Sequence, residues 1–125
     1  MRFCTAINCI DGRVQLPVIN YLQKRFNVEY VDSITEAGPG LILSEEKNIA
    51  VIHAIREKLN ISLERHNSMG IAVVGHHDCA ANPAPYSDQI IQIQSAVRFL
   101  RRHYNNIEII GLCVDDNWQV HEIEN

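Results

Sequence analysis

Residues 70–75 read Gly-Ile-Ala-Val-Val-Gly, a short run without a single polar side chain. A strand that is apolar on both faces is typical of a parallel sheet that helices cover on both sides. Further strand-like runs occur at residues 2–8, 28–31 and 107–114, and segments with helical spacing of apolar residues separate them. This alternation predicts an α/β fold of three layers (αβα), with a mainly parallel sheet in the order 2-1-3-4 and right-handed crossovers.

The boundaries of the expected elements come from capping and turn residues. Pro17 is expected to open the first helix, and the sequence Ala-Gly-Pro-Gly at 37–40 is expected to form a loop. Residues 118–123 alternate in polarity and predict an additional edge strand. The expected helix starts are Ser44 as an N-cap followed by Glu45 and Glu46, and Ser87 as an N-cap with Tyr86 and Ile91 as a hydrophobic staple.

Composition narrows the class of protein. A length of 125 residues, with 46% hydrophobic and 21% charged residues, predicts a single globular domain over 1–125. The formal net charge of −4 argues against a nucleic-acid partner, because phosphates select a basic face. No apolar run is long enough to cross a bilayer, and the N-terminus does not read as a signal peptide, so we expect a cytoplasmic protein.

Two of the four cysteines differ from the others. Cys4 and Cys113 lie inside apolar runs and are expected to fill the core as small hydrophobic groups. Cys9 follows the first expected strand, and Cys79 follows the third together with His76. In the order 2-1-3-4, the carboxyl ends of strands 1 and 3 meet at the point where small molecules bind such sheets. Two sulfur atoms and one imidazole are donors that zinc favours.

The residues alone leave two points open. Either His76 or His77 can supply the imidazole, because both precede Cys79 closely. Asp11 and Arg13 are two residues apart and can form a charge-assisted pair, which is either part of a site or a plain surface salt bridge.

The combination of Cys9-x-Asp11-x-Arg13 with Gly75-His76-x-x-Cys79 resembles the β-class carbonic anhydrases. The resemblance implies that Cys9, His76 and Cys79 bind Zn²⁺, and that zinc-bound hydroxide reversibly hydrates CO2 to bicarbonate. It also implies that Asp11 and Arg13 form the catalytic dyad, with Asp11 either bonded to Arg13 or swung onto the metal as a fourth ligand. His77 falls at a variable position and is expected to be solvated.

The resemblance extends to Ala37 and Gly38, which fall where the family has an Ala-Gly pair lining the active site. The flanking residues depart from the family pattern, and so do two prolines in segment 80–85, which are expected to delay the next helix. Members of the family are typically longer, with N-terminal helices that wrap around a dimer partner, whereas we expect this sequence to enter its first strand directly. We expect a homodimer or higher homo-oligomer that acts on a small molecule, with neither a nucleic-acid nor a membrane partner.

Three alternatives to a carbonic anhydrase stay open. The same site residues would serve a zinc hydrolase of a CO2 analogue such as carbonyl sulfide or carbon disulfide. The altered loop at 36–40 favours a catalytically inactive zinc-binding domain. A redox dithiol of Cys9 and Cys79 ranks last, because it explains neither His76 nor the pair of Asp11 and Arg13.

Overall fold

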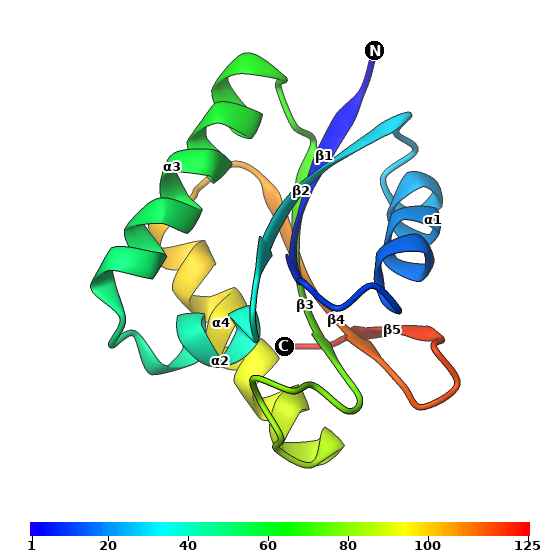
Figure 1. Ribbon diagram of the computed structural model, residues 1–125. Coiled ribbons are helices and arrows are strands. Elements are labelled where there is room, and N and C mark those ends of the chain that lie inside the picture. Colours follow the sequence, from blue (N-terminus) through cyan, green and yellow to red (C-terminus); the bar gives the residue numbers. More distant parts are fainter.

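The computed structural model describes residues 1–125 and contains one five-stranded sheet in the order β2-β1-β3-β4-β5 (Figure 1). The strands are β1 (Phe3–Cys9), β2 (Tyr30–Glu36), β3 (Gly70–His76), β4 (Glu108–Val114) and β5 (Val120–Ile123). The first four pair in parallel, and β5 is antiparallel to β4. The predicted order of the parallel strands and the additional edge strand are therefore confirmed.

Helices cover both faces of the sheet, which makes three layers (Figure 1). They are α1 (Gln15–Arg25), α2 (Pro39–Glu45), α3 (Ile49–Arg65) and α4 (Tyr86–His103). Helix α1 lies on one face, and α2, α3 and α4 lie on the other. Successive residues of β3 alternate between the two hydrophobic cores: Ile71 and Val73 pack on the side of α3 and α4, whereas Ala72 and Val74 pack on the side of α1. No helix has the length and apolar character needed to span a membrane.

The expected position of the second strand was wrong. Strand β2 covers Tyr30–Glu36 and not 28–31, and Val28 instead packs into the core beyond the end of α1. Strand β2 is at the edge of the sheet, and only Ile34 among its residues is buried. An edge strand carries polar side chains, so a search for apolar runs finds only its first residues.

The expected loop at 37–40 and the expected helix start at Ser44 were also wrong. The expected loop at 37–40 already contains the start of α2, with Pro39 in its first turn. Ser44 therefore lies near the end of α2, and Asn48 caps α3 by accepting a hydrogen bond from the backbone N–H of Val51 (3.3 Å). Because the first helical turn needs acceptors for its free N–H groups, an asparagine at this position is as effective as the serine that the sequence suggested.

Prolines lie at the beginning of both α1 and α4. Helix α1 starts at Gln15, so Pro17 lies within its first turn, where a missing N–H costs no hydrogen bond. Helix α4 starts at Tyr86, directly after Pro85, which confirms the expected delay but places the proline and not Ser87 at the N-cap. The expected staple is wrong as well, since Ile91 is 61% exposed.

A buried cluster of hydroxyl groups ties α3 to the sheet and makes a stability prediction. Ser62 contacts Thr5 (2.6 Å) and Ser68 (2.6 Å), and donates to Asp32 (2.7 Å). Ser62→Ala would leave these buried groups short of a partner, so we expect the free energy of unfolding to fall by about 1–3 kcal/mol. Urea denaturation measures the change. Ser87→Ala, at an exposed position, is the control, and an equally small effect in both variants would contradict the prediction.

Candidate metal centre

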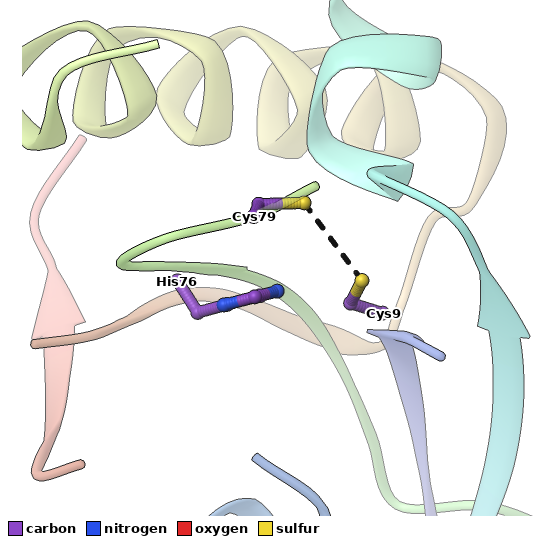
Figure 2. A group of neighbouring side chains, drawn as sticks. All are labelled: Cys9, His76 and Cys79. Carbon is purple, nitrogen blue, oxygen red and sulfur yellow. Dashed lines mark hydrogen bonds between the residues drawn. The ribbon is translucent and has the colours of Figure 1, made fainter. Parts of the chain in front are cut away.

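The three predicted metal ligands lie together at the carboxyl edge of the sheet. Cys9 ends β1, His76 ends β3, and Cys79 is in the turn that follows β3 (Figure 2). Because β1 and β3 are neighbouring parallel strands, their ends reach the same edge. The two Sγ atoms are 3.9 Å apart, and the ligand atoms of all three residues lie within 4.8 Å of one another. All three residues are buried.

The imidazole of His76 is oriented toward this cluster. Its Nδ1 lies 2.7 Å from the carbonyl oxygen of His77, and a carbonyl only accepts, so Nδ1 carries the proton. Nε2 then presents a free electron pair, and this nitrogen is buried with no hydrogen-bond partner in the protein. Buried polar atoms are normally paired, so this nitrogen points to a ligand. A cavity of about 10 Å³, enough for one small species, adjoins Cys9, His76 and Cys79.

The donor set therefore fits a zinc ion. Two thiols and an imidazole whose other nitrogen is fixed by a carbonyl are the arrangement found around zinc ligands, since the second hydrogen bond sets the tautomer. Burial is the main cause that raises the pKa of the Cys79 thiol, and the neighbouring Cys9 raises it further. Cys4 and Cys113, by contrast, lie in the two hydrophobic cores, where burial raises the pKa of each thiol to about 12.

The structure separates the two adjacent histidines. His77 is exposed, its backbone N–H donates to Val114, and its ring lies 6.3 Å from the ring of Trp118. We therefore expect His76→Ala to lose bound zinc and His77→Ala to keep one zinc per chain. Metal analysis of both variants after dialysis measures this. Zinc retained in His76→Ala and lost in His77→Ala would reverse the two roles.

Asp11 and Arg13 form more than an isolated surface pair. Arg13 donates to both carboxylate oxygens of Asp11, with the shortest distance at 2.7 Å. It also donates to the carboxylate (3.2 Å) and the carbonyl oxygen (3.1 Å) of Asp78. The hydrogen bonds from Arg13 lower the pKa of Asp11 to about 2, so this carboxylate is ionised at neutral pH. Its Oδ2 lies 4.0 Å from Nε2 of His76, at the border of the cluster of Cys9, His76 and Cys79.

Ala37 and Gly38 both line cavities that Cys9 also lines. Ala37 lines a largely apolar recess of about 190 Å³, together with Cys9, Ile10, Asp11, Ala80 and Ala81. Gly38 has a left-handed backbone (φ 65°), and a Cβ atom there would lie 3.3 Å from the Cβ of Asn82. Glycine thus lets the start of α2 approach the turn that carries Cys79.

Three amide side chains that support the cluster were missed in the sequence. Gln89 on α4 is buried and accepts a hydrogen bond from the backbone N–H of His76 (2.9 Å). Gln15 donates to the carbonyl oxygens of Cys9 (2.7 Å) and Asp11 (2.8 Å), and Asn8 accepts from the N–H of Cys9 (2.9 Å). The available signal for Gln89 was its position four residues before Ile93 on the buried face of α4.

The fold and the cluster together define an α/β protein with a candidate thiolate and imidazole metal centre at the carboxyl edge of a parallel sheet. Residues 1–124 match a family model described as "Putative carbonic anhydrase". The chain therefore belongs to this family of putative carbonic anhydrases. No curated protein matches the chain.

Solved structures with the same fold include carbonic anhydrases. One is a carbonic anhydrase from Glaciozyma antarctica, with a TM-score of 0.66 and 16% identity over 97% of this chain and 81% of that chain. Another is a tetrameric β-carbonic anhydrase from Sordaria macrospora, with a TM-score of 0.63 and 9% identity over 98% of this chain and 80% of that chain. The predicted resemblance and fold class are confirmed.

Proposed function

We propose that this chain is a zinc-dependent carbonic anhydrase that reversibly hydrates CO2 to bicarbonate. The observation that carries the proposal is the buried Nε2 of His76, which lacks a partner in the protein and lies among two buried thiols. Membership of the carbonic anhydrase family supports the same conclusion.

The proposed ligands are Cys9, His76 and Cys79, which leave a fourth position for water or substrate. Zinc at this position would supply a nucleophile at neutral pH by lowering the pKa of a bound water, which falls to roughly 7 in a site of three histidines. The thiolates of Cys9 and Cys79 would cancel the formal charge of the metal, so the effect on the water would be weaker than with three histidines. A neighbouring carboxylate that accepts a hydrogen bond from the water is therefore more important here.

Asp11 is proposed as that carboxylate, and Arg13 as the residue that orients it. Asp11 Oδ2 is close enough to the cluster to accept a hydrogen bond from a water molecule beside His76 Nε2. Because the pKa of Asp11 is low, its carboxylate is ionised at neutral pH and can only accept hydrogen bonds. The recess beside Ala37 and Ala81 is the proposed place for CO2, because its largely apolar wall suits a molecule without net charge or dipole, and the Asp11 carboxylate lies at its border.

Stopped-flow CO2 hydration on zinc-loaded protein tests the function, with Cys79→Ser as the blank. Metal-dependent hydration above the blank is the expected result. Absence of hydration with one zinc bound per chain would contradict it. Turnover of carbonyl sulfide or carbon disulfide in its place would then identify a hydrolase of a CO2 analogue, and no turnover of any of them a zinc-binding domain without activity.

Assembly and location belong to the same proposal. A homodimer or higher homo-oligomer in the cytoplasm is expected. The Sordaria macrospora enzymes are tetrameric, and β2 leaves one edge of the sheet without a neighbouring strand, which a second copy can cover.

A further inference from the structure

We propose that Trp118 is a positioning residue that holds Arg13, and through Arg13 the carboxylate of Asp11, beside the metal cluster. The inference rests on the proposed function for its catalytic meaning, but the contact itself is independent of any metal. Trp118 lies in the turn between β4 and β5, far from Arg13 in the sequence.

The first observation is that Arg13 is held from several directions at once. Asp11 and Asp78 accept hydrogen bonds from its N–H groups. The indole ring of Trp118 lies against the guanidinium, with Cζ 4.5 Å from the ring centroid. Carboxylates act in the plane of a guanidinium and an aromatic ring acts on its face, so the contacts complement one another. Without the ring, the side chain of Arg13, which is 47% exposed, would have its face open to water.

The second observation is that the turn is built to present Trp118. The backbone of Trp118 is left-handed (φ 59°), which is rare for a bulky residue and persists only where the surroundings enforce it. Asp115 supplies that enforcement. Its Oδ1 accepts hydrogen bonds from the N–H groups of Asn117 and Gln119 (2.9 Å each), and its Oδ2 lies 2.7 Å from Nε2 of His121.

The contact of Trp118 with Arg13 affects which of two positions the Asp11 carboxylate takes. Its carboxylate is bonded to Arg13 yet lies 4.0 Å from the imidazole of His76, so a displaced Arg13 would free it to move toward the metal position. By restraining Arg13, the ring of Trp118 favours the arrangement in which Asp11 stays on Arg13 and the fourth position stays open.

Trp118 is the single tryptophan of the chain, so its fluorescence reports directly on the contact. We expect Arg13→Ala to increase acrylamide quenching of this fluorescence and to shift its emission to longer wavelength, in metal-free protein. Arg98→Ala is the matched control, because Arg98 is exposed and bonds only to Ser95. Equal quenching in the two variants would overturn the proposal.

The catalytic consequence is measured by CO2 hydration in Trp118→Ala and Trp118→Phe. We expect about a two- to five-fold fall in kcat with KM unchanged in Trp118→Ala, as suits a cation–π contact at an exposed site, and recovery of most of it in Trp118→Phe. Asn117→Ala, in the same turn, controls for disturbance of the loop. The same loss in the Phe and Ala variants, or none in either, would overturn the positioning role. A wild-type protein that binds zinc but hydrates no CO2 would refute the proposed function. The fluorescence comparison of Arg13→Ala with Arg98→Ala would then decide whether Trp118 holds Arg13.

Discussion

Cys79→Ser is expected to bind no stoichiometric zinc and to melt at the same temperature with and without added zinc. Serine cannot supply the thiolate, and a site with one sulfur and one imidazole holds zinc weakly. Because the unfolded chain has no preformed site, zinc binding adds to folding stability in the wild-type protein alone. Zinc at a hundredfold excess over Kd adds about 2.7 kcal/mol, which corresponds to roughly 10 °C in Tm for a domain of this size.

Metal analysis and thermal melting with and without a chelator measure these differences. Cys113→Ala is the matched control: it removes a buried thiol from the hydrophobic core beside α4, so it lowers Tm yet keeps one zinc per chain. Stoichiometric zinc retained in Cys79→Ser would refute the ligand assignment.

Zinc affinity should also depend on pH in a defined direction. Burial and the nearby Cys9 raise the pKa of the Cys79 thiol, so the metal-free protein carries a proton there that zinc must displace. Raising the pH weakens this competition, and the zinc affinity of the wild-type protein rises with it. Competition of the wild-type protein with a chelator for zinc at several pH values measures this rise, and an affinity that does not change with pH would contradict it.

The sequence predicted that Cys9, His76 and Cys79 lie together, because the pattern that indicates it is confined to a few residues at each position. Cys9 and His76 lie at the ends of two apolar runs, and Cys79 lies three residues after His76. The parallel pairing of β1 with β3 brings these ends together. The approximate places of the buried strands came from the same apolar runs. The strands depend on composition over a few residues. The meeting of their carboxyl ends depends on the rule of right-handed crossovers in parallel sheets, which few folds violate.

The features that were missed depend on contacts between distant parts of the chain. Strand β2 was misplaced because an edge strand has no need of apolar residues on both faces. Gln89 can be buried because backbone groups of His76 and Asn82, which lie outside its helix, satisfy its amide. The contact of Trp118 with Arg13 follows from the shape of the turn between β4 and β5, which no pattern in the sequence specifies.

Asp11→Asn is expected to keep one zinc per chain and to lower the rate of CO2 hydration by about 10²-fold, the lower end of what a positioned acid–base group contributes. Asparagine preserves the shape of the side chain but presents an amide, which is a weaker acceptor than a carboxylate. It also loses the charge that binds Arg13 through two oxygens, so its orientation beside His76 is less fixed.

Zinc analysis and stopped-flow kinetics on the same preparations separate the roles that Asp11 can have. Asp88→Asn, an exposed carboxylate in the first turn of α4, is the control and should hydrate CO2 at the wild-type rate. An unchanged rate in Asp11→Asn would mean that the pair with Arg13 is structural only. Loss of zinc would mean that Asp11 is itself a required ligand, and that the fourth position is closed by protein and not left to water.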